Sequence, residues 1–200
     1  LTEARTGKTL DAYVQEEFYG PLSLQSTCFN PKKKFPLDRI VPTEKDKYFR
    51  NQEVHAYVHD MGAAMMGGVS GHAGLFASAE DLAIIMQMLL WKGKYAGETF
   101  ISENTVNNFT TRHKLDTRRG IGFDMKQLDP NASSPLSNMA SSQTFGHLGF
   151  TGTAVWADPE TNIIYVFLSN RTFPSMRNYK INKMDIRPKI QSILYESLDQ

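Results

Sequence analysis

The hydrophobic period of the sequence changes near Gly120, and this change limits the fold more than any other feature. Before Gly120, in the segments that start at Thr9, Ser78 and Ser102, apolar residues recur every three or four positions, as on the buried face of a helix. After it, Ile121, Phe123 and Met125 alternate with small or polar residues, as in a strand with one buried face. Helices followed by strands and a closing helix predict an α+β fold.

Four helices are expected, and the first three follow a residue of a type that caps helix N-termini. Their expected starts are Thr9, Ser78, Ser102 and Asp185. In the second helix, Asp81 stands in the reciprocal capping position, and in the third, Val106 and Phe109 should face inward. In the last helix, residues 185–198, the apolar side chains expected to face inward are Ile186, Ile190, Ile193, Leu194 and Leu198.

Strands are expected at 121–126, 144–157 and 163–169, the last of them buried on both faces. A turn at 158–162 would join the last two into an antiparallel hairpin. These strands predict an antiparallel sheet of three or more strands with helices packed on it. The segment 20–64 has no sustained period, and its prolines indicate an irregular segment.

Composition and charge exclude several classes of protein. Lys and Arg number 22 against 21 Asp and Glu, so no strong field directs the chain to nucleic acid. The single cysteine, Cys28, cannot form an internal disulfide. No apolar run approaches the roughly 18 residues needed to span a bilayer. The length suits one domain or part of one, and because Leu1 is not an initiator methionine, we expect the chain to begin inside a longer polypeptide.

Glycines and one histidine are concentrated at 145–153, in the second expected strand. Glycine weakens a strand, so its presence needs a reason, and one reason is a ligand that lies against the strand edge. Gly149 would then give access to the backbone, a nearby N–H could donate to an oxyanion, and His147 would offer a switchable charge. The alternative is an ordinary strand histidine bonded to a carbonyl group, but the glycines favour a site.

The string His147-Leu148-Gly149, followed by Phe-Thr-Gly-Thr at 150–153, resembles the third active-site motif of serine hydrolases related to class C β-lactamases and penicillin-binding proteins. Segments 6–22, 58–60 and 71–82 are similar to other parts of that family, and only about 129–142 is uninformative. The resemblance implies the C-terminal part, residues 1–200, of one β-lactamase-like domain whose N-terminal part is missing.

The family's other two motifs are not found in the chain. No serine has a lysine three positions later, as the nucleophile motif Ser-x-x-Lys requires. Tyr195-Glu196-Ser197 is the nearest formal match to the tyrosine motif, but it follows the third motif and falls on the last expected helix. We therefore expect the parent domain to be a serine hydrolase and this chain alone to be catalytically silent.

The resemblance implies roles for eight residues. His147 would contact a substrate carboxylate or the proton relay, Gly149 would keep the strand edge open, and the Phe150 N–H would supply part of the oxyanion hole. Expected substrate-binding or supporting residues are Gly71, His72, Thr151, His59 and Asp60. Many lactamases and transpeptidases have lysine at the position of His147, and histidine loses its charge near neutral pH. This difference favours an esterase or peptidase over a lactamase.

Cofactors and metals are not expected. His55, His59, Asp60 and His72 would form a metal site only on a helix, which the glycines and the missing period disfavour. The implied partner is a small-molecule or peptide substrate in a periplasmic or other extracytoplasmic setting. The alternative is a non-catalytic binding or scaffold module attached to a larger cell-wall enzyme. An incomplete sheet should leave an edge unpaired, so we expect self-association or a companion N-terminal part.

Overall fold

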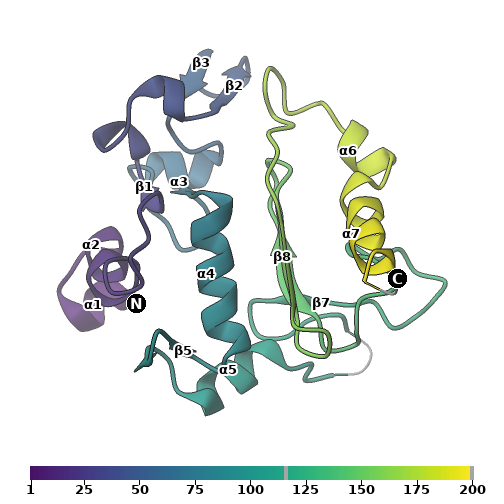
Figure 1. The fold of residues 1–200 in the computed structure, drawn as a ribbon. Coiled ribbons are helices and arrows are strands. Elements are labelled where there is room, and N and C mark those ends of the chain that lie inside the picture. The colour runs from purple at the N-terminus through teal and green to yellow at the C-terminus, as the bar shows by residue number, and fades with distance from the viewer. Residues whose placement is uncertain (115–116, 199–200) are drawn as a thin grey trace. The chain divides into compact units, whose positions relative to one another are not determined.

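A computed structural model describes residues 1–114 and 117–198 (Figure 1). The chain forms two compact units. The first contains Leu1–Asp81 and Asn170–Asn178, and the second contains Leu82–Ser169 and Tyr179–Gln200. Each unit is described by itself.

The first unit consists of short helices and two small antiparallel strand pairs (Figure 1). Its helical elements are α1 (Thr2–Thr6), α2 (Leu10–Val14), a π-helical turn at Gln15–Tyr19, 3-10 turns at Pro31–Lys33 and Leu37–Arg39, and α3 (Met61–Met65). Its strands are β1 (Cys28–Phe29), β2 (Pro42–Asp46), β3 (Gln52–His55) and β4 (Leu75–Phe76). β1 pairs with β4, and β2 pairs with β3.

The β2–β3 pair lies in a segment that the sequence predicted to be irregular, and that prediction is wrong there. The buried face of β2 carries Thr43, Glu44 and Asp46, all less than 8% exposed. Their polar atoms have partners: the Asp46 carboxylate accepts from the Tyr48 and Phe49 N–H groups at 2.8 and 2.9 Å. A polar buried face leaves no apolar alternation to detect.

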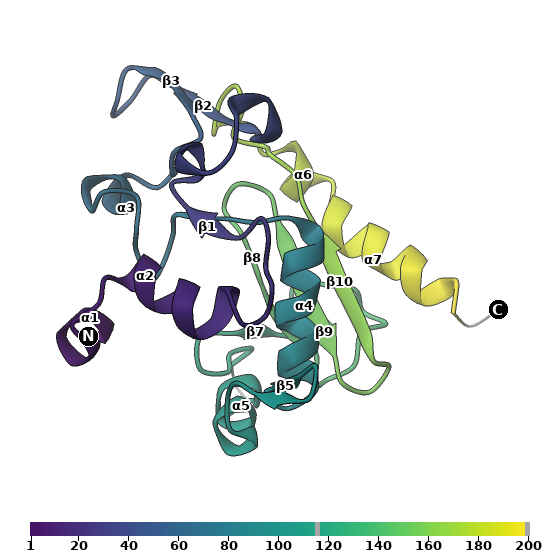
Figure 2. The same ribbon diagram turned by 60° about the vertical axis from the view of Figure 1, so that its left-hand side comes forward.

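The second unit is built on an antiparallel sheet in the order β10-β9-β8-β7 (Figure 2). Its strands are β7 (Asp124–Met125), β8 (Phe145–Leu148), β9 (Ala154–Asp158) and β10 (Ile163–Phe167). The α4 helix (Ala79–Leu90) starts at the end of the first unit. The other elements are a small strand pair, β5 (Lys94–Tyr95) with β6 (Glu98–Thr99), and the helices α5 (Glu103–Thr110), α6 (Lys180–Lys183) and α7 (Ile186–Glu196). The predicted mixture of helices and antiparallel sheet is confirmed.

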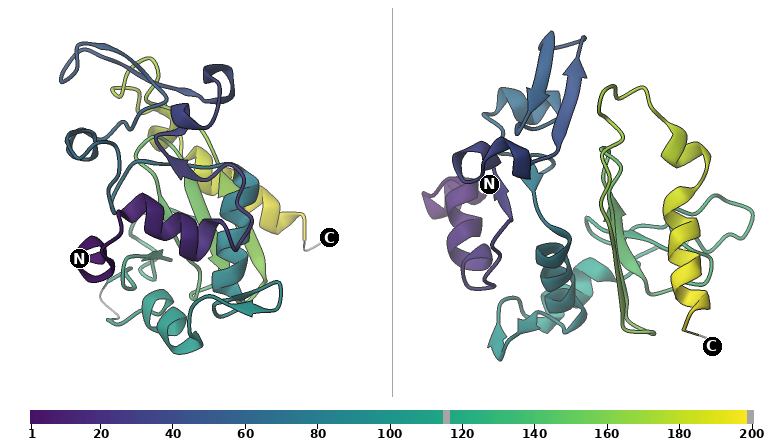
Figure 3. Two further views of the ribbon diagram at one scale, coloured as in Figure 1. Left: turned by 90° about the vertical axis from the view of Figure 1, so that its left-hand side faces the viewer. Right: turned by 45° about the horizontal axis from the view of Figure 1, so that its top comes forward.

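The two faces of this sheet are covered by different helices (Figure 3). On one face Met86 of α4 packs with Phe145 and Ala157. On the other, Tyr195 of α7 packs with Trp156 and Tyr165. Because side chains alternate along a strand, every second residue of β8 points to each helix.

The predicted strand 144–157 is wrong as a single strand, because it is two. β8 and β9 pair with each other, with Leu148 opposite Ala154, and residues 149–153 form the turn between them. The β9–β10 hairpin around 158–162 is confirmed. The strand expected at 121–126 is shorter, since only Asp124–Met125 form β7. The strand expected at 163–169 ends at Phe167, and only Tyr165 in it is buried.

The N-caps of α4 and α5 are confirmed. Ser78 Oγ accepts from the Asp81 N–H at 3.2 Å, and Ser102 Oγ accepts from the Thr105 N–H at 3.2 Å. The Asp81 carboxylate does not complete a capping box but accepts from the Ser26 N–H at 2.7 Å. It also accepts from the buried Thr27 hydroxyl at 2.8 Å, so Asp81 ties a distant segment to the helix start.

The predicted buried faces of two helices are partly wrong. In α5, Val106 is buried but Phe109 is 44% exposed. In α7, Ile190 and Ile193 are 41% and 63% exposed. Leu198 is also exposed, and the buried residues of α7 are Arg187, Gln191 and Tyr195. Each of these three forms a hydrogen bond within the second unit. Arg187 donates to the Thr153 carbonyl, Gln191 accepts from the Ser137 N–H, and Tyr195 donates to the Asp158 carboxylate.

Candidate active site

The third motif lies at the end of β8. His147 stands opposite Val155 in β9 and shares a face with Phe145, two residues before it, so it is on the α4 face. Leu148 points to the other face, where it packs against the cluster around Trp156. His147 itself is exposed. Its Nδ1 atom lies 2.7 Å from the Leu148 carbonyl oxygen, and its Nε2 atom lies 3.3 Å from Arg119 Nη1.

Two consecutive arginines hold a buried carboxylate next to this histidine. Arg118 Nη1 lies 2.7 Å from Asp124 Oδ2, and Arg119 Nη1 lies 3.2 Å from Asp124 Oδ1. The Asp124 side chain is 4% exposed. None of these three residues could be assigned to the site from the sequence, because neither an Arg-Arg pair nor one aspartate in a strand pattern indicates a contact with a distant histidine. Arg119 lies 28 positions before His147.

The glycines of the motif have structural reasons. A Cβ at Gly146 would lie 2.0 Å from the Val155 carbonyl oxygen and 2.7 Å from the Trp156 ring. A Cβ at Gly149 would lie 2.0 Å from Thr153 Oγ1. Close packing inside the β8–β9 hairpin therefore explains both glycines without a ligand.

The turn after β8 carries the other expected motif residues. The Gly149 N–H donates to the Thr153 carbonyl at 2.9 Å, and the Gly152 N–H donates to the Gly149 carbonyl at 3.0 Å. Phe150 is 59% exposed, and Thr151 is half-buried. The Gly152 to Gly149 bond makes Phe150 the second residue of a four-residue turn, which places its amide directly after the strand end.

In the first unit, three of the expected residues meet around the N-terminus of α3. Asp60 caps α3, since its Oδ1 accepts from the Ala63 N–H at 2.8 Å. His72 Nε2 lies 2.9 Å from the same Asp60 oxygen, and His72 Nδ1 lies 2.7 Å from Ser70 Oγ. The Ala63 N–H and His72 together lower the pKa of Asp60. Gly71 is exposed between Ser70 and His72.

His59 is placed in a different environment. Its Nε2 atom lies 3.0 Å from Glu44 Oε2, and both side chains are at most 10% exposed. The other Glu44 oxygen accepts from the Met176 N–H at 2.8 Å. Burial lowers the pKa of His59, Glu44 opposes this, and the nearby Arg50 adds to the lowering. Glu44 therefore joins His59 and the Met176 N–H of segment 170–178 to β2 within the first unit.

The glycine-rich segment 61–74 brings backbone close to backbone. A Cβ at Gly74 would lie 2.3 Å from the Gly68 carbonyl oxygen, and a Cβ at Gly68 would lie 2.3 Å from Asn30 Oδ1. Both residues also have positive φ angles, 116° and 84°. Residues 68 and 74 therefore require glycine for the fold of this loop, whereas a Cβ at Gly71 would meet nothing within 4 Å.

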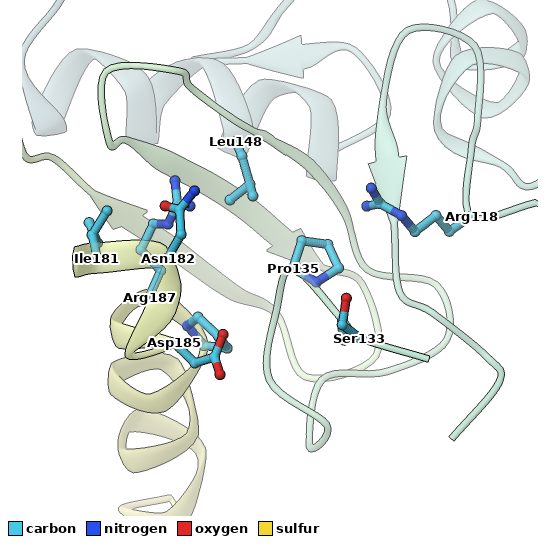
Figure 4. A pocket seen from close by; sticks show the side chains of 10 residues that line it. Arg118, Ser133, Pro135, Leu148, Ile181, Asn182, Asp185 and Arg187 are labelled. Carbon is cyan, nitrogen blue, oxygen red and sulfur yellow. The ribbon is translucent and has the colours of Figure 1, made fainter. Parts of the chain in front are cut away.

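A pocket of about 240 Å³ lies on the α7 face of the second unit (Figure 4). Arg118, Leu148, Asn182 and Arg187 are among the residues that line it. Since Leu148 and His147 are neighbours on one strand, their side chains point to opposite faces. The pocket is therefore not on the side of the sheet that carries His147.

Tyr195 is a structural residue. It is 5% exposed, and its hydroxyl donates to Asp158 Oδ2 at 2.7 Å. Burial and the hydrogen bond to Asp158 raise its pKa, which is unsuitable for a general base. This agrees with our rejection of Tyr195 as the tyrosine motif.

The histidines considered as metal ligands have separate partners. His55 Nε2 lies 2.5 Å from the Ile40 carbonyl, whereas His59 contacts Glu44 and His72 contacts Asp60. Within residues 1–114 and 117–198, no three His, Cys, Asp or Glu side chains gather as metal ligands. In the same part of the chain, no helix has the length and apolar character to cross a membrane.

Comparison with known proteins agrees with the motif and the fold. Residues 1–185 match the β-lactamase family. Two curated relatives, from Escherichia coli O157:H7 and Salmonella schwarzengrund, are each named "Putative D-alanyl-D-alanine carboxypeptidase" and are 40% and 37% identical over 185 and 196 residues. The matches cover 86% and 91% of this chain but 42% and 45% of the relatives. The chain thus spans less than half the length of the relatives it matches.

Two solved structures share the fold. A β-lactamase from Mycobacterium bovis has a TM-score of 0.62 at 19% identity, over 98% of this chain and 59% of that one. A penicillin-binding protein homologue from Caulobacter crescentus has a TM-score of 0.53 at 19% identity, over 82% and 47%. These two likenesses show that the chain has the fold of β-lactamases and penicillin-binding proteins. The chain belongs to the β-lactamase family, and the resemblance inferred from its sequence is confirmed.

Proposed function

We propose that this chain is the C-terminal part of a serine hydrolase domain that cleaves an amide or ester through an acyl-enzyme. The observation that carries the proposal is the His147-Leu148-Gly149 motif at the end of β8, with the Phe150 amide in the turn directly after it. The names of the relatives support a cell-wall peptide that ends in D-alanine as the substrate. Such a substrate is met outside the cytoplasm, so we place the protein in an extracytoplasmic compartment.

The proposed reaction needs a serine from outside the chain. Its hydroxyl attacks the carbonyl carbon, the amine or alcohol leaves with a proton, and water then releases the acid from the acyl-serine. The Phe150 N–H would stabilise the oxyanion in both steps, and the loss of one such donor costs about 3 kcal/mol of transition-state stabilisation. Thr151, in the same turn, would contact the substrate. Within the first unit, Asp60 would hold His72 in place, and His59 would support its loop through Glu44.

The test compares the 200-residue chain with the full polypeptide that its gene encodes. Both are incubated with diacetyl-L-lysyl-D-alanyl-D-alanine, with an activated ester and with a fluorescent penicillin. We expect D-alanine release or a covalent adduct from the full polypeptide and neither from the chain alone. An adduct on the chain would reveal a nucleophile that we have missed. A full polypeptide without Ser-x-x-Lys and without turnover would favour the alternative, a binding or scaffold module.

The role of the Phe150 amide can be tested separately. Phe150→Pro removes the N–H, and proline is favoured at the second position of such a turn. We expect a loss of about 10²- to 10³-fold in kcat in the full polypeptide. Phe150→Ala keeps the N–H and is the matched control. Equal activity of the two variants would remove the Phe150 amide from the mechanism.

We also propose that the outer edge of β10 takes a strand from the rest of the same protein. All five residues of β10, Ile163–Phe167, are apolar or aromatic, and within the described residues the strand pairs only with β9. An apolar edge without charge or proline pairs readily with another strand. The isolated chain should therefore self-associate, and light scattering should detect this. A monodisperse monomer that melts cooperatively would contradict the proposal.

A further inference from the structure

Arg119 is a side chain beside the third motif to which neither the motif nor the comparisons assign a role. Its Nη1 atom lies 3.3 Å from His147 Nε2 and 3.2 Å from Asp124 Oδ1. The Arg119 side chain is 53% exposed, whereas the Asp124 side chain is 4% exposed. Among the described residues Asp124 Oδ1 accepts no hydrogen bond, so the buried carboxylate attracts the guanidinium group toward His147 as an ion pair and leaves much of it open to solvent.

The two contacts of the His147 ring define its protonation. A guanidinium group has only N–H donors, so His147 Nε2 accepts from Arg119 through its lone pair. The other ring nitrogen, Nδ1, lies 2.7 Å from the Leu148 carbonyl oxygen, which can only accept. These two partners match an imidazole ring that donates from Nδ1 and accepts at Nε2.

The positive charge at this position is consequently on Arg119. Arg118 already pairs with Asp124 Oδ2 at 2.7 Å, so two arginines share one carboxylate and the cluster keeps an excess positive charge. Among the residues that the structure describes, the Nε and Nη2 atoms of Arg119 have no hydrogen-bond acceptor. These donors are available to a ligand.

We propose that Arg119 binds the terminal carboxylate of the substrate, while His147 serves as a neutral hydrogen-bond acceptor that orients the guanidinium group. The inference rests on the proposed function and names its substrate class, a peptide-like molecule that ends in a free carboxylate. Guanidinium matches a carboxylate with two parallel hydrogen bonds. Unlike an imidazolium, it keeps its charge through neutral pH.

The first test measures binding without turnover. The ¹⁵N-labelled full polypeptide is titrated with N-acetyl-D-alanine, which carries a carboxylate, and with uncharged N-acetyl-D-alaninamide. We expect the acid, and not the amide, to shift the Arg119 Nε–H signal. Arg119→Met should weaken acid binding roughly 10- to 100-fold. Arg118→Met is the matched control, because it removes the other arginine on Asp124, and it should weaken binding far less.

The second readout is the tautomer of His147, from long-range ¹H–¹⁵N spectra. The proton should be on Nδ1 in the unmodified chain and in Arg118→Met, and Arg119→Met should add the Nε2–H form. Arg119→Lys keeps the charge but loses the two parallel hydrogen bonds, so it should bind the acid more weakly than the unmodified protein and more tightly than Arg119→Met. A predominant Nε2–H form in the unmodified chain, equal binding of acid and amide, or full binding by Arg119→Met would overturn the inference.

The third readout separates this inference from the proposed function. In the full polypeptide, Arg119→Met should raise KM for a peptide with a free carboxylate and leave KM for an uncharged ester unchanged. If the full polypeptide hydrolyses neither substrate but still binds the acid through Arg119, the proposed function fails and the carboxylate site stands. If hydrolysis occurs with an unchanged KM in Arg119→Met, the carboxylate site fails and the proposed function stands.

Discussion

Gly149→Ala should show whether the last residue of the third motif is glycine for packing or for access by a ligand. A Cβ at position 149 would lie 2.0 Å from Thr153 Oγ1 and 3.4 Å from Thr153 Cβ. Gly149 is not among the glycines with positive φ angles, so alanine can adopt its backbone conformation. The whole cost of the substitution should therefore come from one contact, that with the Thr153 hydroxyl oxygen.

The size of that cost follows from the contact distance. Thr153 Oγ1 would have to retreat by at least about 1 Å, by rotation of the side chain or movement of the turn, and overpacking of this kind costs about 1–3 kcal/mol. Replacing glycine by alanine also restricts the unfolded chain and returns about 0.4–1 kcal/mol. We expect Gly149→Ala to lower the free energy of unfolding by about 1–2 kcal/mol. In a Thr153→Ala background, the obstacle is gone and the same change should cost almost nothing.

The assay is a double-mutant cycle of urea denaturation curves. Trp156, which is 1% exposed and packs beside this hairpin, gives the fluorescence signal. The expected coupling between positions 149 and 153 is about 1–2 kcal/mol. If Gly149→Ala costs the same in both backgrounds, the Thr153 hydroxyl is not the obstacle. If it costs nothing in either but raises KM in the full polypeptide, the glycine serves ligand access, as we first expected from the sequence.

Three further experiments test single hydrogen-bonded side chains within each unit. Tyr195→Phe removes a hydrogen bond to the Asp158 carboxylate and should lower the free energy of unfolding by about 1.5–3 kcal/mol. Tyr165→Phe removes a hydrogen bond to a backbone carbonyl and should lower it by only about 0.5–1.5 kcal/mol. Equal losses in urea denaturation would contradict this ranking. Burial alone would raise the pKa of Asp46, but hydrogen bonds from the Phe49 N–H and the residues beside it lower it below the unfolded value. The stability that ionised Asp46 adds to the fold is therefore complete at neutral pH and is lost as the pH falls below about 4. The melting temperature of Asp46→Asn should therefore fall less on acidification than that of the unmodified chain. Ser102→Ala should cost about 1 kcal/mol by calorimetry, and Ser102→Asp should not, because an N-cap acceptor remains.

The parts of the fold that the sequence predicts correctly depend on neighbouring residues. The starts of α4 and α5 were predicted because Ser78 and Ser102 bond to an N–H three positions later. The buried face of α7 was wrong because it depends on residues far away in the chain. Gln191 accepts from the Ser137 N–H, 54 positions earlier, and such partners turn polar residues inward. An apolar period cannot detect this, so the exposed isoleucines were assigned to the core.

The single strand expected at 144–157 fails for a related reason. Alternation continues on both sides of the turn at 149–153, and the sequence shows no break because Gly149 and Gly152 also fit a strand that has a ligand at its edge. The structure distinguishes the two cases through Gly146 and Gly149, whose missing side chains make room for Trp156 and Thr153. A motif that identifies the family thus also encodes a tight hairpin, and both constraints act on the same glycines.

The position of the positive charge illustrates what a motif alone cannot supply. Because lysine at the first position of this motif is itself a cation, matching the sequences position by position assigns the positive charge to residue 147. Histidine at that position can be neutral without loss of charge from the site, provided that a second cation is held beside it. Here Arg119, 28 positions earlier in the chain, meets that condition in an ion pair with Asp124. A point charge on a flexible stem would bind any anion at the strand edge, whereas a planar fork held by a buried carboxylate favours a carboxylate in one orientation. The exchange of lysine for histidine therefore predicts stricter selection of substrates by their terminal carboxylate, and uncharged esters should lose this contribution to binding.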